Sequence, residues 1–536
     1  MTNQKTSVRD LLRGNFGTYT CDTKHALQCL SEAETEAKRY EDEIRRLEAR
    51  VIALKNHQQR VYSQIDQFRS LLAPIRRLPP EILDQVFGFL CIKSSVNSSN
   101  AMDCPAIRLS HVCSGWRELA RNTPSLWSTL SFVLSPESTL PLERVKGMLD
   151  THLELSRHHL LSLTLTIPKD TAVACYLLDK LLDHSSRWST VSINVKGNAH
   201  FNQKLALLKG QLPQLVSFEF DTKLKPLVTS PIDVFQTAPA LRKVTIGFPV
   251  SFESVSLPWH QLTHLRFVHW NMDNFVARLK QAGQARHVTL ERFEPWDLSN
   301  KAILKHSNIQ SLSIIVDEDD PSASWMLRYL TLPNLTHLSL SQYEDYRSDD
   351  VSQLDEFMAP FLTRSSCNLS SLSLVNLNIP GPDLVALFKC LPSLSALTVH
   401  EHKLLPYGMY LNTMLTSQIL GHLTVNHRES FGSILLPHLK VLDFRFHVES
   451  SSILSLLKML HSRWIPDVSD FEPLSEARVD SLASVTLRPL IRIESEDPDF
   501  QSLHALKAAG LRVLIQSEIS SQARYELVEG FNVQFR

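Results

Sequence analysis

The chain has 536 residues with a formal net charge of −1; 43% of its residues are hydrophobic and 21% are charged. This length and composition are typical of a soluble protein with more than one structural unit, and they argue against a disordered chain or a membrane protein. A nearly neutral chain has no overall field that would attract nucleic acid or an anionic membrane, so we expect neither as a partner.

The N-terminus and the cysteines indicate the compartment. The first residues lack the apolar run of a secretory signal, and no stretch reaches the ~20 apolar residues that span a bilayer. The eight cysteines are scattered without a C-x-x-C pair, which is typical of free thiols in a reducing environment. We therefore expect a protein of the cytoplasm, the nucleus or both.

A heptad repeat follows a polar N-terminal segment. Residues 1–24 are aperiodic and are expected to form a disordered tail, whereas residues 25–73 are expected to form a coiled-coil helix that Pro74 ends. The seam consists of Leu30, Ala37, Ile44, Val51, Gln58, Ile65 and Leu72 at positions a, and Ala33, Tyr40, Leu47, Leu54, Val61 and Phe68 at positions d. Either a second copy covers this seam, giving a homodimer, or the helix folds back on its own chain or stands partly exposed.

Residues 74–127 are the segment around which the chain is organised. Pro79 and Pro80 suit the first turn of a helix, and a second amphipathic helix ends at Pro124. So short a segment cannot easily bury a core of its own, so some of its apolar residues are candidates for a partner surface. The apolar stripes are Leu83, Val86, Phe87 and Leu90 in the first helix and Leu109, Val112, Cys113, Trp116 and Leu119 in the second, followed by Leu126 and Trp127.

This segment resembles an F-box. The pattern is Leu-Pro-x-Glu-Ile/Leu, then an apolar Phe, Val-Cys-x-x-Trp-Arg and a closing Leu-Trp, and it is met by Leu78, Pro79, Glu81, Ile82, Leu83, Phe87, Val112, Cys113, Trp116, Arg117, Leu126 and Trp127. A long spacer, 91–106, departs from the compact pattern. The resemblance implies a small three-helix unit that binds the Skp adaptor of a cullin–RING scaffold. The contacts that it implies are Leu78, Pro79, Glu81, Ile82, Leu83, Val86, Phe87, Leu90, Val112, Trp116, Leu126 and Trp127.

From residue 127 to residue 536 the organisation changes to a repeat. An apolar template, Φ-x-x-Φ-x-Φ, recurs about every 27 residues, a period that resembles leucine-rich repeats. Helical patterns lie between the copies, and the fifth template position is polar in every copy. We therefore predict an α/β solenoid, a curved horseshoe with a parallel sheet. The copies begin at Trp127, Leu160, Trp188, Leu215, Leu241, Leu262, Ala285, Ile309, Leu335, Leu369, Leu394, Leu420, Leu439, Leu482 and Ala508.

The third, fifth and seventh template positions should face the concave side, because side chains alternate across a strand. Basic and imidazole side chains there would suit an acidic or phosphorylated peptide substrate. They are Lys243, His264, Arg266, His287, His337, His422 and Arg445. The simpler interpretation is that these are tolerated polar residues on wet strands, since Glu219, Glu291 and Asp443 share the face.

No phosphate-binding glycine loop, nucleophile elbow or HExxH motif occurs, so we expect a non-catalytic protein without metal or cofactor. An F-box followed by leucine-rich repeats resembles the substrate receptors of SCF ubiquitin ligases. The resemblance implies that the F-box binds the Skp adaptor and that the solenoid binds an unknown protein substrate. The alternative is a non-ligase scaffold in which the coiled coil and the solenoid assemble partners.

Overall fold

The computed structural model describes residue 13 and residues 23–91, 94–96, 102–135, 141–169, 171–195, 204, 206–221, 233–247, 256–268, 272–292, 303–316, 322–343, 354–403, 414–426, 434–447, 450–465, 479–490 and 498–516. The chain forms two compact units, Met1–Gln85 and Val86–Arg536, and each is considered by itself. Most of the predicted tail at residues 1–24 lies outside the described residues.

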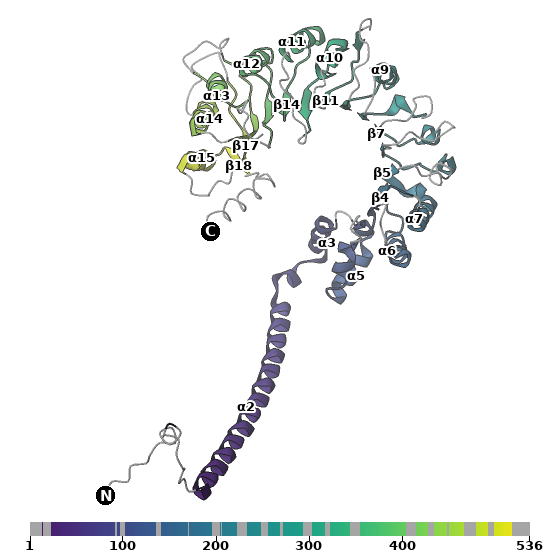
Figure 1. The fold of residues 1–536 in the computed structure, drawn as a ribbon. Helices are drawn as coiled ribbons and strands as arrows, with labels where there is room; N and C mark the ends of the chain where they lie inside the picture. The colour runs from purple at the N-terminus through teal and green to yellow at the C-terminus, as the bar shows by residue number, and fades with distance from the viewer. Residues whose placement is uncertain are drawn as a thin grey trace. The chain divides into compact units, whose positions relative to one another are not determined.

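The first unit is dominated by one long helix, α2, at Thr23–Leu72 (Figure 1). The helix begins two residues before the predicted start and ends, as expected, just before Pro74, where a short 3₁₀ turn, η1 (Pro74–Arg77), follows. Ion pairs within the helix, such as Arg45 with Asp42 at 2.7 Å, stabilise single turns. Among the described helices, none has the length and apolarity needed to cross a membrane.

The docking segment forms four short helical elements: α3 (Pro80–Leu90), α4 (Pro105–Ser110), α5 (Ser114–Asn122) and the 3₁₀ turn η2 (Pro124–Trp127). The second predicted helix is therefore divided. Cys113 breaks it, because this residue is extended (φ −160°, ψ 172°) and its sulfur accepts the N–H of Trp116 at 3.5 Å as the N-cap of α5.

A parallel sheet makes up most of the second unit. Its described strands are β3 (Thr129–Val133), β4 (Leu161–Ile167), β5 (Trp188–Val195), β6 (Ser217–Asp221), β7 (Lys243–Gly247), β8 (His264–Val268), β9 (His287–Glu291), β11 (Ser311–Val316), β13 (His337–Gln342), β14 (Ser371–Val375), β15 (Ala396–His400), β16 (Val441–Phe446), β17 (Ser484–Pro489) and β18 (Arg512–Ile515). They follow one another in chain order, and β10 (Leu304–Lys305) pairs with β12 (Leu330–Thr331) in a separate small sheet.

Helices cover one face of this sheet. They are α6 (Leu142–Leu155), α7 (Ala172–Asp183), α9 (Met272–Gln281), α10 (Ser322–Tyr329), α11 (Leu354–Ser365), α12 (Gly381–Lys389), α13 (Ser417–Leu423), α14 (Ser450–Arg463) and α15 (Pro498–Ala508). Between β5 and β8 the described parts of the connections instead contain the 3₁₀ turns η4 (Ala206–Leu208), η5 (Val234–Thr237) and η7 (Trp259–Gln261). Figure 1 shows α10 to α14 on the convex side of the curved sheet.

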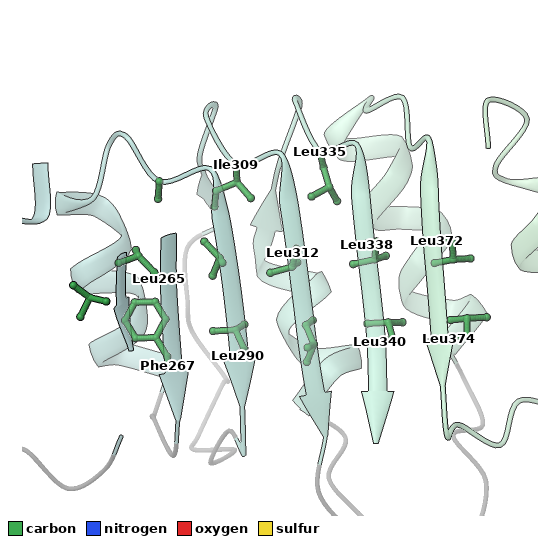
Figure 2. Packing of buried hydrophobic residues seen from close by; sticks show 14 of the residues in the cluster. Leu265, Phe267, Leu290, Ile309, Leu312, Leu335, Leu338, Leu340, Leu372 and Leu374 are labelled. Carbon is green, nitrogen blue, oxygen red and sulfur yellow. The ribbon is translucent and has the colours of Figure 1, made fainter. Parts of the chain in front are cut away.

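The core lies between the sheet and these helices. The fourth and sixth template positions are buried in the strands from β3 to β17, as in Leu265 and Phe267, which are 3% and 1% exposed. The parallel register keeps equivalent positions side by side: Leu312 pairs with Leu338, which in turn pairs with Leu372. These leucines form continuous rows across neighbouring strands (Figure 2), so each repeat buries its apolar face against the next.

Two predicted copies are placed differently from the rest. The copy at Leu420 is not a strand, because Leu420 and Leu423 are buried residues of the helix α13. The copy at Ala508 is displaced by two residues, since Val513 pairs with Val485 and Leu514 with Thr486. The other predicted copies lie on described strands in the predicted register.

Two arginines, Arg463 and the half-buried Arg364, bind one repeat to the preceding one, a feature that the sequence analysis missed. Arg463, at the end of α14, is fully buried and donates to the carbonyls of Leu423, Leu435 and Leu436 at 2.6, 2.6 and 2.8 Å. Arg364 of α11 likewise donates to Leu327 and Leu330. Burial lowers the pKa of Arg463 to about 10, so the guanidinium stays charged at neutral pH and satisfies carbonyls that water cannot reach.

We predict that Arg463→Ala lowers the free energy of unfolding by about 3 kcal/mol or more, because three buried carbonyls lose charged donors. Urea titration of the full chain measures the change. Arg512→Ala, at an exposed position of β18, serves as the control and should change stability by less than about 0.5 kcal/mol. Equal effects of the two substitutions would show that Arg463 contributes nothing specific.

Candidate functional site

Helix α3 has one buried and one exposed apolar face. Leu83 and Phe87, one turn apart, are 8% and 0% exposed, and Phe87 packs edge-on against Trp116 of α5 with ring centroids 4.8 Å apart. These two side chains belong to the core, which agrees with the expectation that part of the α3 stripe packs on the Trp116 helix, and their contact with an adaptor stays a prediction.

The opposite face of α3 remains exposed. Ile82, Phe89 and Leu90 are 42%, 78% and 56% exposed, and Val86 is half-buried between them. Phe89 was missed in the sequence analysis, although its distance of seven residues from Ile82 places both on one helical face. Of the other predicted adaptor contacts, Leu78, Pro79, Glu81 and Val112 are exposed, and Trp116 is partly exposed.

Leu126 and Trp127, which the sequence analysis predicted as adaptor contacts, are buried in the chain alone, and their contact with the adaptor stays a prediction. They are 3% and 1% exposed. The indole N–H of Trp127 donates to the carbonyl of Ala120 at 2.7 Å, and its ring packs edge-on against His152 of α6 at 5.1 Å. Trp127 therefore joins α5 to the first helix of the solenoid, so within Val86–Arg536 α5 and the sheet share one core.

The spacer between α3 and α4 extends the sheet. Its strand β1 (Ser94–Val96) pairs in parallel with β3, and β2 (Met102–Asp103) pairs antiparallel with β1. This short hairpin covers the hydrogen-bonding edge of β3, which would otherwise be open to another strand. The thiols of Cys91 and Cys104, which flank the hairpin, have pKa values raised to about 11 by burial and are unreactive at neutral pH.

The sheet face opposite the helices carries the third, fifth and seventh template positions and is called here the open face. Four of its residues form the basic row: Lys243, His264, His287 and His337. Lys243 pairs with His264 and His264 with His287, while Ser311 lies between His287 and His337. The sequence analysis predicted these four residues on one face, and the strand register places them at equivalent positions.

Stacking and hydrogen bonds hold the imidazoles of the basic row. The rings of His264 and His287 stack with centroids 4.3 Å apart. The hydroxyl of Thr263 forms a hydrogen bond with Nδ1 of His264 at 2.9 Å, and the hydroxyl of Thr336 forms one with Nδ1 of His337 at 2.8 Å. The Nε2 atoms of His264 and His337 have no hydrogen-bond partner among the described residues.

Positive neighbours lower the pKa values of two imidazoles in the basic row. Burial lowers the pKa of His264, and the neighbouring His287 and Lys243 lower it further. Burial likewise lowers the pKa of His287, together with the positive charges of His337, Lys243 and Arg286. The lowered pKa values keep the imidazoles of His264 and His287 mostly neutral at pH 7, and an anion placed beside them would favour their protonation.

Two acidic groups of the open face, Glu291 and Asp443, bind partners outside the basic row. Glu291 forms an ion pair with Arg266 and accepts the hydroxyl of Tyr343, so Arg266 is not free to bind a substrate. Asp443 bonds His400 and Arg488, both at 3.0 Å. Glu219, at the fifth template position of β6, lies one strand away from Lys243. None of these carboxylates forms an ion pair with the basic row among the described residues.

Two predicted substrate residues are not part of the basic row. His422 is exposed on helix α13, because the template copy at Leu420 is helical. Arg445 is only 5% exposed, and its guanidinium donates to the carbonyl of Glu401 and to the side chain of Asn376. Arg445 therefore stabilises the ends of β15 and β16 and is not accessible to a substrate.

The described residues contain no group of three His, Cys, Asp or Glu side chains that could hold a metal ion. No curated protein matches the chain significantly. The model of the family described as F-box-like matches residues 75–133, from η1 to the end of β3. The match does not extend over the remaining repeats. This chain therefore contains an F-box-like domain at residues 75–133.

Proposed function

We propose that the chain is a non-catalytic substrate receptor of an SCF-type ubiquitin ligase, which binds the Skp adaptor through the F-box-like domain and a protein substrate through the open face. The observation that carries the proposal is the exposed face of α3 within the family match. Ile82, Phe89 and Leu90 remain accessible in the chain alone, whereas the residues of the other face are buried. A large exposed apolar group in a folded segment is typical of a protein interface.

The basic row supports a substrate with anionic groups. Two Nε2 atoms and the Lys243 ammonium are not bonded to other described residues, and every charged group that shifts the pKa of His287 is positive. Carboxylate or phosphate oxygens would accept charge-assisted hydrogen bonds there. We infer that the row binds an acidic or phosphorylated segment of the substrate.

A non-ligase scaffold is the second candidate, because α2 exposes its whole heptad seam, as Leu47 and Phe68 illustrate with 54% and 65% exposure. An exposed heptad seam would allow the chain to associate with another helix whether it is a ligase receptor or a scaffold. Co-purification separates the two functions: a receptor captures the adaptor together with the cullin, whereas a scaffold captures neither.

We predict that Phe89→Asp weakens adaptor binding at least about 30-fold, because removing an apolar anchor from an interface commonly costs about 2 kcal/mol or more. Isothermal titration of the full chain with purified Skp adaptor measures the change. The fold should persist, since Phe89 is 78% exposed. Leu454→Asp, at a 57% exposed position of α14, is the matched control and should leave binding unchanged. Equal adaptor affinities for the unsubstituted chain, Phe89→Asp and Leu454→Asp would show that the exposed face of α3 does not bind the adaptor.

The double substitution Leu78→Ala with Pro79→Ala should also abolish adaptor capture, since both side chains are exposed and match the F-box pattern. The unfolding midpoint of the solenoid should not move, because neither residue is part of its core. Pull-down with the adaptor and thermal unfolding, carried out on the same preparation, test both expectations. Undiminished capture contradicts the role of these two residues.

We predict that an anionic peptide binds the basic row more tightly as pH falls. The pKa values of His264 and His287 lie below 6.5 in the free chain, and an anion raises them, so affinity should rise as pH falls towards and below about 6.5. Fluorescence anisotropy with phosphoserine peptides, and with the same peptides lacking phosphate, measures this dependence. Binding should weaken as salt rises.

Substitutions localise the effect. Lys243→Glu with His287→Ala should reduce phosphopeptide affinity at least about ten-fold and leave adaptor binding intact, because one charge is reversed and one imidazole is lost. Ser484→Glu, at the same template position of the distant strand β17, is the control. Affinity that ignores pH, salt and the double substitution would place the substrate elsewhere.

A further inference from the structure

The heptad seam of α2 is uncovered along its whole length. The apolar a and d residues other than alanine are between 37% (Ile65) and 68% (Leu72) exposed, so no described residue of the first unit, Met1–Gln85, covers them. A helix of 50 residues with such a seam needs a partner helix in water. The flanking charges and the seam volumes indicate which helix this is and in which direction it runs.

Charges at the flanking positions e and g disfavour a parallel pair of identical helices. In a parallel pair each g residue faces the e residue five positions further along the partner. This places Glu36 against Glu41, Glu43 against Glu48, and Arg50 against Lys55 of the second copy. All three contacts join like charges, and each occurs twice in a symmetric dimer.

An antiparallel pair reverses this balance, because the e and g residues from Glu34 to Glu48 are all acidic, whereas those from Arg50 onward include three basic residues and no acidic one. When Val51 lies level with Leu54 of the second copy, each e residue faces an e residue of that copy and each g residue faces a g residue. Glu48 then meets Lys55, and Glu34 meets Arg69, each twice by symmetry. The carboxylate of Glu48 and the ammonium of Lys55 have no ion-pair partner among the described residues, so both are available. One contact is unfavourable, that of Arg50 with His57.

The seam volumes favour the same register. Antiparallel pairing places Ala37 opposite Phe68 and Ala33 opposite Leu72, so small residues meet large ones. Parallel pairing would place alanine against alanine and phenylalanine against phenylalanine. The alanine layers would then leave voids, and the phenylalanine layer would be overpacked. Only the layer of Gln58 favours the parallel arrangement, in which the two amides would meet instead of facing Leu47.

We propose that α2 pairs with α2 of a second copy as an antiparallel coiled coil in which residues 33–72 of the two chains overlap. The proposal concerns α2 alone and rests on the proposed function only for what its two ends carry. Residue 72 lies level with residue 33 of the second copy, and at about 1.5 Å per residue the two positions 72 are about 60 Å apart. Since Pro74 begins the docking segment, the dimer separates its two F-box-like domains by the length of the coil.

Pulsed dipolar spectroscopy of the full chain tests the direction. A nitroxide on an azide-bearing residue, introduced in place of Gln67 so that the native cysteines stay unchanged, should give a distance of about 45 Å in the antiparallel dimer and about 20 Å in a parallel one. The same label in place of Ala53, near the centre, should give about 20 Å. A short distance at position 67, or no dipolar coupling at either position, overturns the proposal.

A charge reversal provides a second test. Lys55→Glu should raise the dissociation constant of the dimer roughly ten-fold in the antiparallel register, because two carboxylates then face each other at two places. In a parallel dimer the same substitution would tighten association, since position 55 faces Arg50. Adding Glu48→Lys should restore the original affinity. Sedimentation analysis measures all three chains, and adaptor binding by the same samples shows separately whether the proposed function holds.

Discussion

The structure depends on the alternation of buried and exposed side chains along a ladder of parallel strands. Because alternate side chains point to opposite faces, a slip of one residue in any strand would expose its leucines and bury its polar residues. The pairing of Leu312 with Leu338 and Leu372 keeps the core rows continuous. The same register sets His264 beside His287 on the open face, so the core determines where the candidate binding residues lie.

The alternation explains why the fold was largely predictable from the sequence, and it also explains the failures. Apolar residues at the first, fourth and sixth template positions specify a strand only when a helix can be excluded. Leu420 and Leu423 are three residues apart, a spacing that a buried helical face also uses, and α13 results. At the last copy, Leu511 and Val513 matched the template, but pairing with β17 displaced the register by two residues.

The candidate site was less predictable, because burial is a property of the assembled chain. The F-box pattern identified Phe87 and Trp127 by type, but their contacts with Trp116 and His152 come from other elements and place both in the core. Phe89 lies outside the pattern and is the most exposed apolar residue of α3. Likewise, no periodicity signals that Arg445 is covered or that Arg463 binds three carbonyls of earlier repeats.

Each surface therefore rests on a different part of the chain. The exposed face of α3 requires only that Leu83 and Phe87 stay buried, whereas the basic row requires the register of β7, β8 and β9. The heptad seam of α2 depends neither on the burial of Leu83 and Phe87 nor on the strand register. We therefore expect that substitutions can disrupt the proposed adaptor docking, substrate docking and dimerisation one at a time.

The central claim is that the F-box-like domain presents its exposed apolar face to an adaptor while the solenoid remains unchanged. Hydrogen–deuterium exchange of the full chain, with and without purified Skp adaptor, tests this most directly. The account predicts slower amide exchange in residues 78–91 and 107–117 and unchanged exchange in the strands from β4 onward. Unchanged exchange across α3 at saturating adaptor would contradict it.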